Sequence, residues 1–80
     1  MHINKAISQL MRDNGVTQSA MAASIGKRRA NDVSARLATS NMTINRAIEM
    51  LEVMGYEMVI QRRIPGARRK DQIVIERSDR

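Results

Sequence analysis

The sequence predicts a mainly α protein, in which a compact domain of four short helices precedes a two-stranded antiparallel β-hairpin. Apolar residues recur at helical spacing in four segments before Gly55, and turn residues separate these segments. After Gly55 the pattern changes to two short runs of β-forming residues. Because 80 residues make one small domain, we expect residues 1–55 to form the helical part and residues 56–80 a hairpin extension packed on it.

Each expected helix is delimited by residues that favour helix ends. The helices cover about residues 2–13, 18–25, 29–39 and 44–54. Thr17 and Thr43 are suited to cap the second and fourth helices, because a hydroxyl can accept from a free backbone N–H. Gly15 can take the left-handed conformation that ends a helix, and Gly55 ends the fourth. The fourth helix is expected to bury a stripe made of Ile44, Ala47, Ile48, Leu51 and Met54.

The hairpin is expected to pair Tyr56–Gln61 with Gln72–Glu76, and Pro65 and Gly66 give a turn signal between the two strands. The run Ile73–Ile75 is apolar on both faces, which predicts that it is buried. An isolated hairpin is marginal in water, and an exposed strand edge invites pairing with another chain. We therefore favour a homodimer, although a hairpin folded back on its own helices in a monomer is the alternative. The candidate interface residues are Met58, Ile60, Ile73, Val74 and Ile75.

The charge of the chain favours a nucleic acid or an anionic surface as partner. The formal net charge is +6 and the pI is about 11.1. The alternative is a solvated surface that happens to be basic. Since the sequence has a single Tyr and neither Phe nor Trp, it lacks the aromatic platforms on which single-stranded RNA readers stack bases.

Nothing in the sequence indicates an enzyme, a cofactor or a metal site. The chain has one His, at position 2, and no Cys, so neither a Cys-based zinc site nor a disulfide framework can form. Glu49 and Glu52 are expected on a solvated helix face without a converging pocket. The start of the sequence has no apolar run typical of a signal peptide, and no stretch approaches the roughly 18 apolar residues that span a bilayer. We therefore expect a cytoplasmic protein without a membrane partner.

Residues 16–37 predict two short helices joined by a tight basic turn, an arrangement that can present one helix to a DNA groove. If Ala30, Val33 and Leu37 face inward, the opposite side of that helix carries polar residues. Arg can bond guanine in bidentate fashion, Asn can do so with adenine, and the methyl group of Ala can contact thymine. Asp32 could accept from cytosine or pair with a neighbouring arginine, and we favour the pairing. The candidate base-contacting residues are Arg28, Arg29, Asn31, Ser34 and Ala35.

Further polar and basic residues are candidates for contact with DNA phosphates, which set the register on the duplex rather than the choice of sequence. Gln18 stands at the start of a helix, where backbone N–H groups and a partial positive charge face outward. Five cations and no acid lie between residues 62 and 70, at the expected hairpin tip. The alternative role for this tip is a solvated loop that keeps strand edges apart. The phosphate-contact candidates are Gln18, Lys27, Arg36, Asn41, Arg62, Arg63, Arg68, Arg69 and Lys70.

Residues 16–37 resemble the helix-turn-helix of the Cro/repressor (XRE-type) family. The resemblance lies in four residue pairs, namely Thr17-Gln18, Met21-Ala22, Ile25-Gly26 and Val33-Ser34. It covers about residues 2–58 and implies a lambda-repressor-like fold. One departure shifts the register of the groove-facing residues, because Val33 stands seven positions after Gly26 where the family usually has six. The C-terminal hairpin resembles the extensions by which some phage-type members dimerise.

The resemblance implies operator binding by a homodimer, with two half-sites about one helical turn apart on one face of the DNA. We therefore expect a sequence-specific, double-stranded DNA-binding transcriptional regulator that recognises an inverted repeat. Of the two directions of regulation, we favour repression. The alternative is an antitoxin-like protein-binding module that also binds its own promoter.

Overall fold

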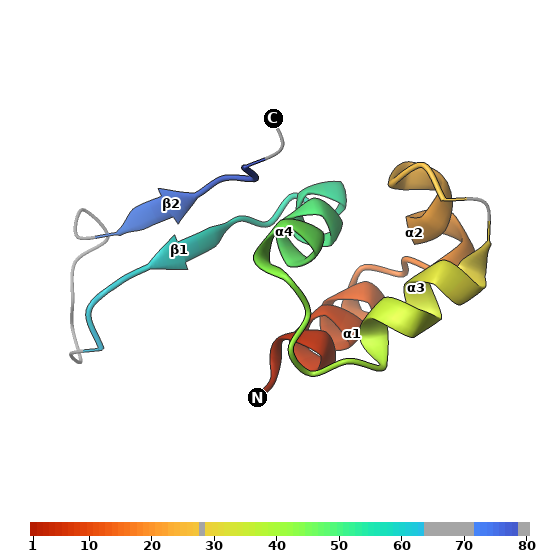
Figure 1. The fold of residues 1–80 in the computed structure, drawn as a ribbon, viewed down its shortest axis with the longest axis horizontal. Helices are drawn as coiled ribbons and strands as arrows, with labels where there is room; N and C mark the ends of the chain where they lie inside the picture. Colours follow the sequence, from red (N-terminus) through yellow and green to blue (C-terminus); the bar gives the residue numbers. More distant parts are fainter. Residues whose placement is uncertain (28, 64–71, 79–80) are drawn as a thin grey trace.

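The computed structural model describes residues 1–27, 29–63 and 72–78, and over these ranges it confirms the predicted fold class. Four helices precede a two-stranded antiparallel sheet (Figure 1). The elements are α1 (Ile3–Asp13), α2 (Gln18–Ser24), α3 (Ala30–Leu37), α4 (Ile44–Val53), β1 (Met58–Ile60) and β2 (Ile73–Ile75). The helix ends differ from the expected ones by one or two residues, and both strands are shorter than predicted. Arg29 precedes α3 in an extended conformation, with φ −130° and ψ 143°, so it is the N-cap residue rather than part of the helix.

The helix ends follow the chemistry that the sequence predicts. Thr17 Oγ1 accepts from the backbone N–H of Ala20 at 3.0 Å, and Thr43 Oγ1 accepts from that of Arg46 at 3.4 Å. Each hydroxyl thereby satisfies one N–H that has no partner within its own helix. Gly15 follows α1 with φ 67°, a left-handed conformation that a residue with a Cβ adopts at a cost.

All four helices contribute to one hydrophobic core. Without Phe or Trp, this core is built from methionine and small aliphatic side chains, which adapt to irregular gaps. Its buried members are Ile7, Met11, Met21, Ala22, Val33, Ala47, Met50 and Leu51.

Helix α4 buries most of the predicted stripe, since Ala47, Ile48 and Leu51 are buried and Met54 packs against the core, but the stripe differs at two positions. Met50, which was not predicted, is fully buried, whereas Ile44 is 59% exposed. The reason lies in the position of α4 between the other helices and the hairpin (Figure 1). Ala47 and Met50 belong to the helical core, and Ile48, which is also buried, lines a hollow with the hairpin residues Val59 and Val74. A helix covered on two sides buries a wider arc than one apolar stripe.

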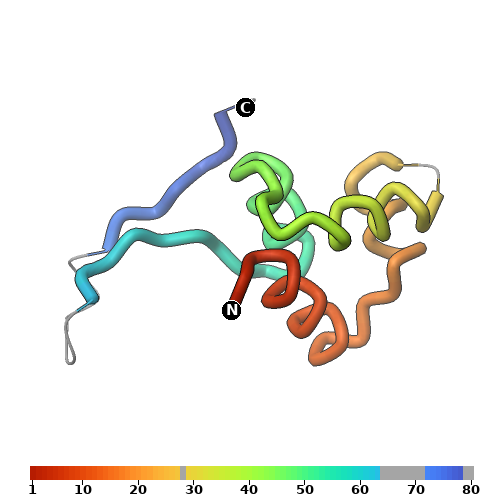
Figure 2. The backbone as a smooth tube through the Cα atoms, turned by 60° about the horizontal axis from the view of Figure 1, so that its bottom comes forward, coloured from red at the N-terminus to blue at the C-terminus, as the bar shows by residue number. Residues whose placement is uncertain are grey.

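The hairpin extends away from the helices, as the two views agree (Figures 1 and 2). Its strands pair in the register Met58↔Ile75, Val59↔Val74 and Ile60↔Ile73. Met58 packs against the helical core, and Ile75 is half-buried. The prediction that the whole Ile73–Ile75 run is buried is wrong for the single chain, because the end of the hairpin remote from α4 has no helix to cover it. The predicted turn at Pro65 and Gly66 lies outside the described residues.

The segment after β2 returns to α4. Ser78 donates its backbone N–H to Asn45 Oδ1 at 3.0 Å, and Asn45 Nδ2 donates to Ser78 Oγ at 2.9 Å. Arg77 pairs with Glu49 at 2.9 Å and with Glu52 at 3.2 Å. Glu49 and Glu52 were expected on a solvated face, but both are half-buried and held in these ion pairs. The segment that follows β2 is therefore anchored on α4.

We predict that Met50→Ala lowers the free energy of unfolding by about 2–5 kcal/mol, because it leaves a cavity at a fully buried position. Val53→Ala on the same helix is the matched control, since that side chain is 37% exposed and its truncation leaves no closed cavity. Urea unfolding followed by circular dichroism measures both values. Equal losses for the two variants would contradict the placement of α4.

Candidate nucleic-acid interface

Helix α3 is held in the core along one side only. Val33 is fully buried, and Ala30 and Leu37, which lie on the same side, are half-buried. Asn4 of α1, itself buried, donates from Nδ2 to the backbone carbonyl of Leu37 at 2.9 Å and so satisfies an acceptor at the end of α3. This contact was not predicted, because a polar residue among apolar ones on a helix face gives no sign of its partner. The inner side of α3 is thus fixed by packing and by a hydrogen bond.

The outer side of α3 is exposed and polar. Five of its side chains face solvent, namely Arg29, Asn31, Asp32, Ser34 and Ala35. Arg29, Asn31, Ser34 and Ala35 are predicted base-contacting residues, and the fifth, Arg28, lies outside the described residues. Asp32 was expected to pair with an arginine, yet no ion pair joins it to Arg29 or Arg36 in the described part of the chain. Apart from the Ser34 hydroxyl, which donates to Gln18, the polar groups of these side chains face solvent, where a ligand can reach them.

The start of α2 is tied to the outer part of α3 by one side-chain hydrogen bond. Ser34 Oγ donates to Gln18 Oε1, so two residues that were predicted for different roles lie together. The bond uses the acceptor oxygen of the Gln18 amide and leaves its donor group, Nε2, able to face an anion. Gln18 is exposed at the first position of α2, as a phosphate contact at a helix start requires.

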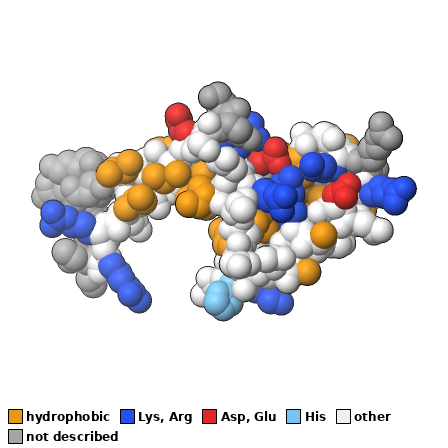
Figure 3. All heavy atoms as spheres, in the orientation of Figure 1, with side chains coloured by type: hydrophobic (Ala, Val, Ile, Leu, Met, Phe, Trp, Pro, Cys, Tyr) orange, Lys and Arg blue, Asp and Glu red, His pale blue; other side chains and the backbone are white. Residues whose placement is uncertain are grey.

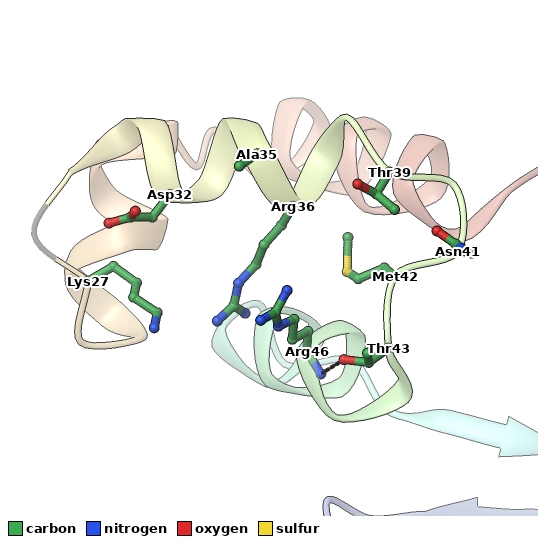
Figure 4. Close-up of a pocket in the computed structure, with 9 residues that line it drawn as sticks. All are labelled: Lys27, Asp32, Ala35, Arg36, Thr39, Asn41, Met42, Thr43 and Arg46. Carbon is green, nitrogen blue, oxygen red and sulfur yellow. Dashed lines mark hydrogen bonds between the residues drawn. The ribbon is translucent and has the colours of Figure 1, made fainter.

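A hollow of about 430 Å³ lies between α3, the segment after it and the start of α4 (Figure 4). Three cations from separate segments line it, namely Lys27, Arg36 and Arg46, and Asn41 lies at the far side. Lys27, Asn41 and Arg46 are exposed. Asp32 also lines the hollow, so exposed Lys27 and Arg46 and the amide of Asn41 are accompanied there by one carboxylate.

Arg36 does not extend freely into this hollow. Its Nη1 lies 2.7 Å from Glu49 Oε1, and its side chain is only 9% exposed. It was predicted to contact phosphate, but its guanidinium is held by a carboxylate of α4. The Arg36 guanidinium is therefore poorly placed to contact a phosphate.

Arg46 was missed by the sequence prediction. It lies in the first turn of α4, where its backbone N–H is capped by Thr43 and where no acidic residue stands. A cation in the first turn is opposed by the partial positive charge of the helix start. This unfavourable placement is the signal by which the sequence could have singled out Arg46 as a further candidate for phosphate contact.

The hairpin presents two further kinds of surface. Ile60, Ile73 and Val74 are 58%, 62% and 49% exposed. Figure 3 shows hydrophobic side chains over the two strands and the adjoining part of α4, and Lys, Arg and acidic side chains between α4 and α3. Arg62 and Arg63 are exposed beyond β1, whereas Arg68, Arg69 and Lys70 lie outside the described residues. An apolar surface is therefore separated in space from the polar face of α3.

Among residues 1–27, 29–63 and 72–78, no group of three or more His, Cys, Asp or Glu side chains could hold a metal ion. In the same part of the chain, every helix is too short or too polar to cross a membrane.

No family model matches this chain, and no curated protein or solved structure matches it. The resemblance of residues 16–37 to the Cro/repressor family therefore stays a prediction.

Proposed function

We propose that this protein is a cytoplasmic, sequence-specific double-stranded DNA-binding protein, which acts as a homodimer on an inverted-repeat operator and regulates transcription as a repressor. The observation that carries the proposal is the outer face of α3, where Arg29, Asn31 and Ser34 are exposed while Val33 on the opposite side is fully buried. Eight helical residues span about 12 Å. A helix of this size fits the major groove, where each base pair presents its own pattern of donors and acceptors.

Phosphate contacts on both sides of α3 would fix its orientation in the groove. On one side, Gln18 at the start of α2 keeps its amide donor free while its oxygen is bound to Ser34. On the other side, exposed Lys27, Asn41 and Arg46 surround the hollow beside α3. Such contacts set the register of the protein on the duplex, and each neutralised phosphate adds to the salt dependence of binding.

A second copy of this chain is the partner that we propose for the exposed face of the hairpin. Ile60, Ile73 and Val74 lie on a two-stranded sheet, and each strand has one edge without a strand partner among the described residues. Because each of these side chains is already about half covered, complete burial of one of them would contribute roughly 1–2 kcal/mol. An operator with two-fold symmetry requires a two-fold dimer, so this partner agrees with the proposed DNA target. A different protein, as in the antitoxin-like alternative, would use the same apolar surface.

The DNA target can be identified by selecting bound sequences from a random duplex library at near-physiological salt. We expect an inverted repeat with a fixed half-site spacing. Asn31→Ala should then weaken binding to the selected sequence by about 1–3 kcal/mol and leave binding to random DNA unchanged. Gln9→Ala, an exposed amide on α1, is the control. Equal losses on both DNAs would remove Asn31 from base recognition, and a library without an enriched motif would contradict the proposed function.

Arg46→Gln should weaken binding to all duplexes and reduce the slope of log K against log salt by about 0.9, because one phosphate contact is lost. Lys5→Gln, which removes one exposed positive charge from α1, is the matched control and should leave the slope nearly unchanged. Fluorescence anisotropy over a series of salt concentrations measures the slopes. The same slope for wild type and Arg46→Gln would exclude Arg46 from the interface.

Ile73→Lys should convert the dimer to a folded monomer, since it places a charge on the apolar surface that the second copy would cover. The side chain is already 62% exposed in the single chain, so we expect the helical fold to persist. Gln61→Lys, an exposed change just beyond β1, should leave the dimer intact. Sedimentation equilibrium gives the masses. A dimer that survives Ile73→Lys would place the interface elsewhere, and a wild-type monomer would favour the antitoxin-like alternative.

A further inference from the structure

The carboxylate of Glu49 is shared between two arginines that lie far apart in the sequence. Arg36 of α3 binds Oε1 at 2.7 Å, and Arg77, which follows β2, binds Oε2 at 2.9 Å. The exposed fractions of the side chains of Arg36, Glu49 and Arg77 are 9%, 24% and 20%. Charge-assisted hydrogen bonds that are this shielded from water are stronger than those on an open surface. One carboxylate of α4 thus joins α3 to the C-terminal segment.

The position of Arg77 is determined by contacts on several sides. Its Nε also lies 3.2 Å from Glu52 Oε1, one turn further along α4. The next residue, Ser78, exchanges two hydrogen bonds with Asn45 on the same helix. Because Arg77 is bound to two acids and its neighbour is bound to Asn45, its guanidinium holds the Glu49 carboxylate in one place.

The two flanks of the outer face of α3 are held by different helices. Ser34 on one flank is bonded to Gln18 of α2, and Arg36 on the other flank is paired with Glu49 of α4. Residues two apart on a helix lie about 200° apart around its axis, so these contacts restrain its rotation from two sides. Rotation about this axis would move Asn31 and Ala35 relative to any groove that they face. The Glu49 contact therefore helps to fix the direction in which the outer face points, together with the buried side of α3 and the Gln18 contact.

We propose that Arg77 is a positioning residue for α3, which acts through Glu49 on Arg36 and couples the C-terminal hairpin to the DNA-reading face. The coupling itself follows from the ion pairs, while its effect on DNA rests on the function proposed above. Arg77 stands two residues after the end of β2, so a change in the hairpin, such as pairing with a second copy, is transmitted to α3 along this route. Arg77, which lies outside the helical part of the chain, thereby affects how well the protein distinguishes its operator from other DNA sequences.

The test compares Arg77→Gln with Lys5→Gln, which also removes one positive charge but lies on α1. The first readout is hydrogen exchange of the backbone amides of α3 and needs no DNA. We expect Arg77→Gln to raise exchange in residues 30–37 by about threefold to tenfold, and Lys5→Gln to leave it unchanged. The second readout is the ratio of affinities for the selected and a random duplex, which Arg77→Gln should lower by about the same factor. Sedimentation at the same concentration verifies that equal fractions are dimeric.

Two further variants separate positioning from a general loss of stability. Arg77→Lys keeps one charged donor near Glu49 and should restore part of the affinity ratio. The double variant Glu49→Gln with Arg77→Gln should be no worse than Glu49→Gln alone, because Arg77 acts through that carboxylate. Additive losses would show that Arg77 acts independently and would overturn the proposal. If Arg77→Gln unfolds the chain, Arg77→Lys supplies the exchange and affinity readouts in its place.

The two proposals can fail separately. Unchanged exchange in α3 of Arg77→Gln overturns the coupling, even if the wild-type protein selects an operator. If α3 exchanges faster in Arg77→Gln but the wild-type protein selects no sequence, the coupling stands and the DNA-binding function fails.

Discussion

Burial of one side of α3 around Val33 is the constraint on which the arrangement of this protein depends. A chain without Phe or Trp has few large side chains with which to fill a core, so its helices must approach closely through small aliphatic and methionine side chains. Val33 is β-branched and stiff about χ1, and it meets the same core as Met21 of α2 and Met50 of α4. Because this side of α3 is committed to the core, the opposite side must face solvent with the polar residues that it carries.

Helix α4 gives the molecule its second organising feature. It contributes Ala47 and Met50 to the helical core and Ile48 to the side that faces the hairpin. Its acidic residues, Glu49 and Glu52, bind arginines instead of lying in water. The helix that supports the core thus also connects α3 with the segment after β2. The two proposed surfaces are therefore linked through α4.

The outer face of α3 and the exposed face of the hairpin differ in chemistry. Each suits the partner proposed for it, which is DNA for α3 and a second copy of the chain for the hairpin. The outer face of α3 and the hollow beside it carry amides and cations, which suit base edges and phosphates. The hairpin exposes Ile60, Ile73 and Val74, which water does not solvate well and which a second apolar surface would cover. Separation of these surfaces would let one chain contact DNA and another copy of itself without competition, as proposed above. The net charge of +6 favours the approach of the whole molecule to DNA.

The sequence by itself determined the fold class, the caps at Thr17 and Thr43, and the polar outer side of α3, because each depends on residues within one or two helical turns. Only the tertiary structure decided that α4 is covered on two sides, that Ile73 and Val74 stay exposed in the single chain, and that Arg36 is withdrawn from solvent. The partners of Glu49 are 13 and 28 residues away along the chain. Helical periodicity shows which residues share a face, but it holds no information about which element will cover that face or which charge will meet it.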